Sequence, residues 1–124
     1  MTPSNQSGKN LEYWQAEVVA VNKDKGWYDT PVSFLDAMCL LHSEVSEAVE
    51  AWRNWDTADA TSKVIDQGEG HARPKPEGVG SEFADIFIRL LDYCERFGID
   101  LGCEVERKLE FNRTRSYRHG GKRA

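Results

Sequence analysis

Two pairs of acidic residues, each with a spacing of three, could carry chemistry in this sequence. Glu44 and Glu47 lie in "LLHSEVSEAVEAW", and Glu82 and Asp85 lie in "SEFADIFIRLL". On a helix, this spacing places both carboxylates of a pair on neighbouring positions of one face. Such a pair can be a solvated surface, or it can bind a divalent cation. Oxygen-only ligands suit Mg²⁺, with Mn²⁺ as a substitute, rather than Zn²⁺.

The first pair flanks an apolar stripe. At about 100° per residue, Glu44 lies about 60° and Glu47 about 120° to one side of Leu41, whereas Glu50 falls on the opposite face. The stripe that we expect to form the core comprises Phe34, Met38, Leu41, Val45, Ala48 and Trp52.

The second pair lies on the same rotational side of its own helix, relative to Phe83. If the two helices pack face to face and antiparallel, both pairs converge on one groove. Four carboxylates so close together cannot all stay ionised without a compensating cation. The matching flanks therefore favour a metal site over an exposed surface.

Four helical patterns position these residues. The first covers about residues 10–23, and the second starts with Thr30 as N-cap and Pro31 at the first helical position and ends near Trp55. A third follows Ser81 and ends at Gly98, and a fourth begins at the cap Asp100. We find no strand-like alternation, so the predicted fold is an all-α four-helix bundle.

The chain of 124 residues is expected to be a single domain, 1–124. Residues 1–9 are expected to be flexible, 56–81 to form a long loop or lid, and 116–124 to form a basic tail. There is no apolar run of ~20 residues and no signal-peptide core, which predicts a cytoplasmic protein without a membrane segment. The three cysteines are interpreted as buried free thiols: Cys39, Cys94 and Cys103.

Charge is distributed unevenly along the chain. Residues 1–106 hold nine Lys/Arg and twenty Asp/Glu, a balance of −11, whereas residues 107–124 hold seven Lys/Arg and one Glu, a balance of +6. The basic end predicts an anionic ligand or partner. Lys108, Asn112 and Arg115 share one helical face, which suits a polyphosphate beside the metal site. Alternatively, Lys108 snorkels and Arg115 pairs with a surface acid.

The combination resembles the MazG-type all-α nucleoside triphosphate pyrophosphohydrolases, relatives of dimeric dUTPases and phosphoribosyl-ATP pyrophosphatase. The similarity covers roughly residues 30–118, in "EVSEAVEAWRNW", "SEFADIFIRLLDYC" and "KLEFNRTRSYRHGGK". The chain departs from the pattern in its longer segment between the acidic motifs. It also has Arg89 where some relatives carry an aromatic residue.

The resemblance implies Mg²⁺-dependent hydrolysis of a (deoxy)nucleoside triphosphate to the monophosphate and pyrophosphate, as pool house-cleaning or regulation. The four acidic residues would be metal ligands, with Glu47 activating the water. Lys108, Asn112 and Arg115 would contact phosphate.

Trp27 and Trp55 are candidates for a base pocket. Apolar residues off the main stripes predict a homodimer or homotetramer, because a lone small bundle would leave them exposed. The alternative is a non-catalytic helical module that binds nucleic acid through its basic C-terminus, although the acidic body makes nucleic acid an unfavourable partner.

Overall fold

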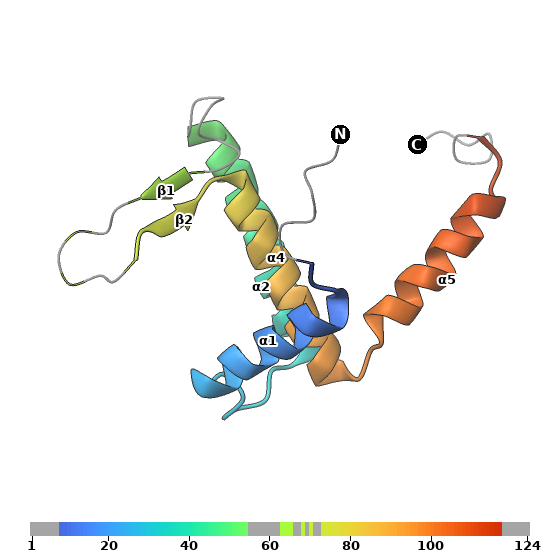
Figure 1. The fold of residues 1–124 in the computed structure, drawn as a ribbon, viewed down its shortest axis with the longest axis horizontal. Coiled ribbons are helices and arrows are strands. Elements are labelled where there is room, and N and C mark those ends of the chain that lie inside the picture. The colour runs from blue at the N-terminus through green and yellow to red at the C-terminus, as the bar shows by residue number, and fades with distance from the viewer. Residues whose placement is uncertain (1–7, 55–62, 66–67, 69, 71–72, 118–124) are drawn as a thin grey trace.

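The structure, a computed structural model of the chain, describes residues 8–54, 63–65, 68, 70 and 73–117. Within these residues the fold is mostly helical, as predicted, with one small two-stranded sheet (Figure 1). The elements are α1 (Leu11–Asp24), α2 (Phe34–Asn54), β1 (Lys63–Ile65), β2 (Lys75–Glu77), α4 (Val79–Phe97) and α5 (Leu101–Thr114).

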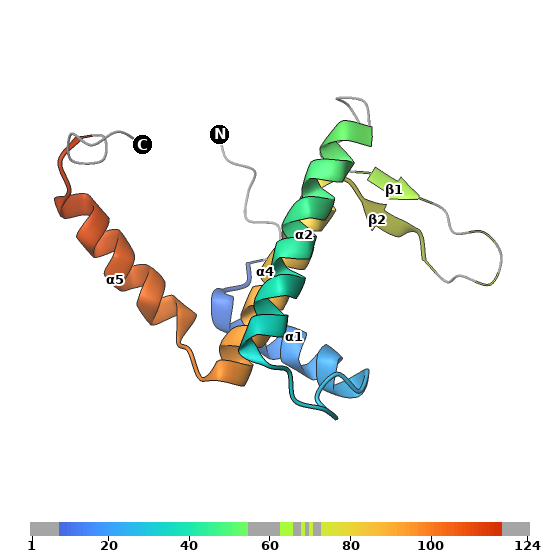
Figure 2. The same ribbon diagram turned by 180° about the vertical axis from the view of Figure 1, so that it is seen from behind.

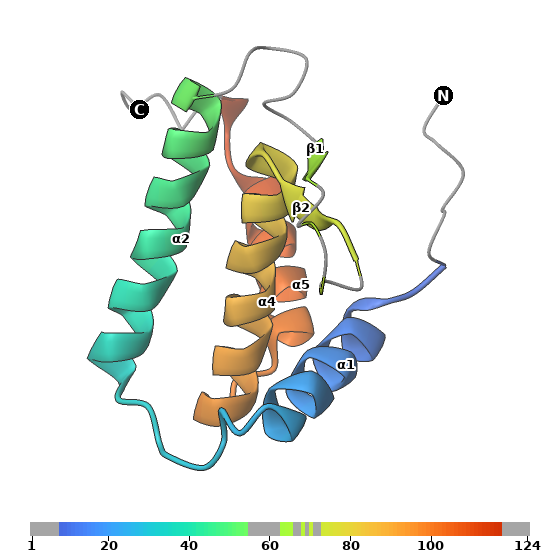
Figure 3. The same cartoon turned by 90° about the vertical axis from the view of Figure 1, so that its left-hand side faces the viewer.

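The centre of the fold is the pair formed by α2 and α4, which run side by side (Figure 3). The pair is antiparallel: the ring of Phe34, at the start of α2, lies 5.5 Å from the ring of Phe97, at the end of α4. The helices therefore face each other as the sequence analysis assumed, and the acidic segment of α2 lies beside the first turns of α4.

The buried face of α2 differs from the predicted apolar stripe. Ala37, Ala48 and Ala51 are buried together with Glu44, whereas Phe34, Val45 and Trp52 are about half exposed or more. The small alanine side chains let the two helices approach closely, so the contact face is rotated toward the glutamates. The prediction was right for Ala48 and wrong for Phe34, Val45 and Trp52, because it weighted apolar character and not side-chain size.

α1 packs against α4 and completes the small core. Val18 and Val19 of α1 are buried, and Gln15 Nε2 donates a hydrogen bond to the Leu91 carbonyl at 3.4 Å. Leu91 itself has no exposed surface. The helix begins after Asn10, whose Oδ1 accepts from the Tyr13 N–H at 2.9 Å, close to the predicted start.

The predicted helix ends are confirmed on either side of the turn between α4 and α5. Gly98 adopts the left-handed conformation, with φ of 68°, and Asp100 accepts from the Cys103 N–H at 3.0 Å. The prediction of Thr30 and Pro31 as the start of α2 was wrong. Ser33 caps the helix instead, since its Oγ accepts from the Asp36 N–H at 3.1 Å. Serine and threonine hydroxyls are both good helix caps, so residue type alone does not distinguish the two positions.

Part of the predicted loop 56–81 is a β-hairpin, so the absence of strands was also wrong. β1 and β2 pair antiparallel with Val64 opposite Pro76. The hairpin leads through Gly78, with φ of 100°, into α4, which begins at Val79 and not after Ser81. Three residue pairs give too little sequence for an alternating pattern. Residues 1–7, 55–62 and 118–124 lie outside the described residues.

α5 extends away from the other helices instead of joining them in a bundle (Figures 1 and 2). Every residue from 102 to 114 is exposed, including Val105 and Leu109 of its predicted core stripe. Cys103 on α5 and Cys39 on α2 are also exposed, so of the cysteines predicted to be buried only Cys94 is. The part of the chain that the structure describes therefore contains three packed helices and a fourth that is not packed against them.

Among the described residues, none of the helices is both long enough and apolar enough for a bilayer span.

Leu91→Ala is expected to lower the free energy of unfolding by about 2–5 kcal/mol, because it opens a cavity at a side chain that has no exposed surface. Val21→Ala on α1, whose side chain is 54% exposed, is the matched control and should change stability by less than about 0.5 kcal/mol. Urea unfolding followed by circular dichroism measures both. Equal effects of the two substitutions would contradict this core.

Candidate metal centre and adjoining pocket

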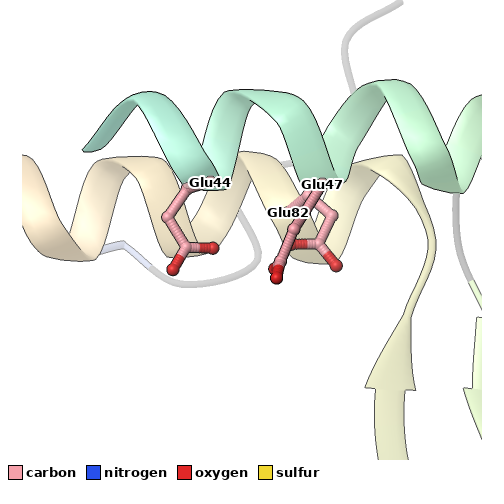
Figure 4. Close-up of side chains that lie close together, drawn as sticks. All are labelled: Glu44, Glu47 and Glu82. Carbon is pink, nitrogen blue, oxygen red and sulfur yellow. The ribbon is translucent and has the colours of Figure 1, made fainter. Parts of the chain in front are cut away.

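Three of the four predicted carboxylates meet between α2 and α4. One oxygen from each of Glu44, Glu47 and Glu82 can be chosen so that all three lie within 4.8 Å of one another. Figure 4 shows the side chains projecting to the same side of the helix pair. Asp85, one turn further along α4, does not belong to this group of three. We call Glu44, Glu47 and Glu82 the carboxylate cluster.

Two oxygens of the cluster are buried without a hydrogen-bond donor among the described residues: Glu44 Oε2 and Glu82 Oε2. Glu44 is only 8% exposed, and its other oxygen, Oε1, accepts from Arg89 Nε at 2.7 Å. A buried carboxylate oxygen without a partner is costly, because it has lost its hydration. A divalent cation would give both oxygens the positively charged partner that they lack. This set of oxygen ligands therefore fits a hard cation.

The carboxylates of α4 experience the negative charge of the cluster. The pKa of Glu82 is raised by burial and further by the charges of Glu47, Asp85 and Glu44. The pKa of Asp85 is also raised, first by burial and then by Glu44 and Glu47. Asp85 is therefore electrostatically coupled to the cluster although it lies outside the group of three.

Arg89 partly compensates this negative charge. Its Nε bonds to Glu44, and its Nη1 donates to the Tyr93 hydroxyl at 3.3 Å. Burial would lower the pKa of the guanidinium, but the hydrogen bonds to Glu44 and Tyr93 outweigh burial and raise it. Arg89 is therefore a fixed cation that holds one oxygen of Glu44 and leaves the other available.

Lys75 on β2 is a second cation near the cluster, and sequence reasoning missed it. It pairs with Glu77 at 2.9 Å. Its pKa is raised mainly by Glu77, with further contributions from Glu82 and Glu47. No periodic pattern surrounds Lys75, so only knowledge of the hairpin could have placed it beside the acidic residues.

The structure does not bring the predicted phosphate-binding residues to the cluster within one chain. Lys108, Asn112 and Arg115 are all exposed on or just after α5. The ammonium of Lys108 and the guanidinium of Arg115 lie 5.9 and 5.8 Å from the centre of the Phe111 ring. They form one surface with that ring, on the helix that extends away from α2 and α4.

A pocket of about 550 Å³ adjoins the cluster. Glu44 of the cluster lines this pocket, together with Asp85, Arg89 and Trp27. The wall also contains apolar side chains from three segments: Val32, Leu40 and Ile88. Of the two tryptophans predicted for a base pocket, Trp27 lines this pocket, and Trp55 lies outside the described residues.

A buried ion pair anchors the wall that contains Trp27. Asp92 accepts from the Tyr28 hydroxyl and from Arg96 Nε, both at 2.7 Å, and Arg96 Nη2 donates to the Trp27 carbonyl at 2.7 Å. Although burial opposes it, these hydrogen bonds lower the pKa of Asp92, and burial together with Asp92 raises the pKa of Tyr28. The i,i+4 spacing of Asp92 and Arg96 was a visible signal, but their partners in residues 27–28 were not.

Comparisons with models of known protein families, with curated proteins and with solved structures found no match to this chain.

We expect Glu82→Gln to stabilise the magnesium-free protein at pH 7.5, because it removes a negative charge that is unfavourable in the folded state. The pKa of Glu82 is raised in the folded state, so the folded state binds more protons than the unfolded state between the ordinary and the raised pKa. Stability therefore falls as pH rises through that window, and removing the charge removes this loss. Thermal unfolding between pH 4 and 8 measures it.

Magnesium should reverse the ranking of the two proteins. At ten times its Kd, the ion would stabilise the wild type by about 1.4 kcal/mol and Glu82→Gln by less. Glu50→Gln is the matched control, because Glu50 is an exposed glutamate of α2 outside the cluster and should leave both responses unchanged. Equal magnesium stabilisation of wild type and Glu82→Gln would contradict the site.

Proposed function

We propose that the chain hydrolyses a (deoxy)nucleoside triphosphate to the monophosphate and pyrophosphate in a Mg²⁺-dependent reaction. The observation that carries this proposal is the pair of unpartnered buried oxygens on Glu44 and Glu82, in a three-carboxylate cluster that adjoins a pocket. A surface cluster of acids would instead have hydrated oxygens. The resemblance of the acidic motifs to the MazG-type enzymes agrees with this chemistry.

Each member of the site would have a separate task. Glu44, Glu47 and Glu82 would hold Mg²⁺, or Mn²⁺ in its place, with Asp85 as a further ligand. The bound cation would neutralise charge on the phosphate oxygens and lower the pKa of a nearby water. Glu47 is the exposed member of the cluster, so its carboxylate is the one that can orient or deprotonate an attacking water.

The phosphate chain needs cationic partners as well as the metal. Lys75 lies close enough for the cluster to raise its pKa, so it is suited to contact phosphate from the hairpin side. Lys108, Asn112 and Arg115 remain candidates for phosphate contact only if α5 packs beside the carboxylate cluster of another chain. The nucleoside would occupy the adjoining pocket, with Trp27 as the aromatic wall. Such a reaction would remove triphosphates from the nucleotide pool.

We propose further that the functional unit is a homodimer or homotetramer in which α5 of one chain packs against α2 of another. Val105 and Leu109 of α5 and Val45 and Trp52 of α2 are exposed apolar residues without a cover in the described chain. Docking would bury both sets.

Charge also favours this docking. α2 carries four acidic residues and one arginine, whereas Lys108 and Arg115 provide cations on the α5 side. Oppositely charged surfaces orient two partners correctly during association. Docking would bring the predicted phosphate-binding residues to a cluster of the second chain.

Glu47→Gln is expected to lower the rate of pyrophosphate release by about 100-fold or more, because it removes the proposed base. The assay incubates a panel of nucleoside triphosphates with Mg²⁺ and measures pyrophosphate. Glu50→Gln is the control and should retain full activity. Activity that is unchanged in Glu47→Gln would overturn the assignment, and salt-sensitive nucleic-acid binding without turnover would instead support the non-catalytic alternative.

Mixing two inactive variants tests the shared site. If α5 acts in the partner's site, a dimer of Glu47→Gln with Arg115→Ala contains one doubly altered site and one intact site. Unfolding and refolding an equal mixture should then restore activity to about one quarter of the wild-type value. Glu47→Gln mixed with itself is the control. Light scattering would show whether the mixture is oligomeric. If it is oligomeric and its activity does not recover, α5 and the cluster of the same chain act in one site, and the shared site is wrong.

A further inference from the structure

Arg89 has unused hydrogen-bonding capacity inside the pocket. A guanidinium carries five N–H donors, of which Glu44 takes the one on Nε and Tyr93 takes one on Nη1. Three donors therefore have no partner among the described residues, and both donors of Nη2 are among them. Because Glu44 and Tyr93 hold the group from two sides, its free edge is fixed in position.

The buried acid of the same pocket has no comparable capacity. Asp92 Oδ1 accepts from Tyr28 and Asp92 Oδ2 accepts from Arg96. Arg96 is also occupied, since it bonds to Asp92 and to the Trp27 carbonyl, and its guanidinium stacks 4.0 Å from the centre of the Tyr28 ring. The pocket beyond the carboxylate cluster thus offers free donors from Arg89, whereas its buried carboxylate is already paired.

The arrangement along α4 sets the direction of a bound nucleotide. Glu82, Asp85, Arg89 and Tyr93 follow one another at steps of three, four and four, so they lie on one face of the helix. Phosphates held at Glu82 and Asp85 would place the nucleoside toward Arg89 and Tyr93. Leu40 and Ile88 line the same pocket and provide apolar surface for a flat base.

We propose that Arg89 selects 6-oxopurine bases, of the guanine and hypoxanthine type, by donating from its free Nη edge to O6 and N7 of the base. This pairing is the commonest bidentate contact between arginine and a base. Adenine has an amino group at position 6. This group is a hydrogen-bond donor, so it cannot accept from the Arg89 N–H groups. The proposal rests on the proposed nucleotide site and specifies its substrate.

Binding of uncharged nucleosides tests the proposal without metal or catalysis. Inosine and adenosine are similar in size and differ at position 6 and in the hydrogen on N1, so the ratio of their Kd values measures selection at this edge of the base, and the Arg89 variants assign it. NMR titration of the full chain should give inosine about tenfold tighter binding than adenosine. Tighter binding of adenosine, or of uridine or cytidine, would overturn the proposal.

Arg89→Lys is the informative variant, because it keeps a cation beside Glu44 but loses the planar donor edge. It should bring the ratio of Kd values close to one, and Arg89→Gln should do the same. Arg53→Lys, an exposed arginine of α2, is the control and should keep the wild-type ratio. A wild-type ratio in Arg89→Lys would overturn the proposal. An Arg89→Lys protein with wild-type circular dichroism excludes misfolding as the cause of any loss.

The two proposals can fail separately. A chain that discriminates inosine through Arg89 but releases no pyrophosphate from any triphosphate would keep this inference and overturn the hydrolysis. A chain that hydrolyses triphosphates with equal kcat/KM for inosine and adenosine forms would keep the hydrolysis and overturn the role of Arg89.

Discussion

The burial of Glu44 between α2 and α4 is the interaction on which the site depends. A carboxylate at a helix–helix contact is unfavourable unless it has partners, and Arg89 satisfies only one of its oxygens. The alanines of α2 bring the helices together around it, which also brings Glu82 close. The small residues that allow close packing therefore create the unpaired oxygens that make the site suitable for a cation.

Most of the helices could be predicted from sequence, because caps and apolar spacing are local signals. Gly98 and Asp100 act as the predicted caps, and α1 begins within one residue of its predicted start. The contact face of α2 could not be predicted from apolar pattern alone, since Ala37, Ala48 and Ala51 carry little apolar surface but allow the closest approach. The exposed apolar stripes of α2 and α5 were also predicted to be buried within one chain, for the same reason. A pattern reports which face is apolar, but not which partner covers it.

For the site, the spacing of Glu44, Glu47 and Glu82 was sufficient to predict their convergence, because an antiparallel helix pair brings matching flanks together. The cations were less predictable. Lys75 is placed near the cluster by a hairpin with three residue pairs, and the pairing of Arg89 with Glu44 joins residues 45 apart in sequence. Such contacts arise from tertiary packing, and no local pattern encodes them.

The polar residues of α4 have a geometric consequence for substrate length. Glu82 and Arg89 are seven residues apart on one continuous helix, so their Cα atoms are separated by about 10 Å along its axis. A rigid helix cannot shorten this span. If cation and base bind at its two ends, α4 acts as a molecular ruler, and a nucleotide with a shorter phosphate chain could occupy one end but not both.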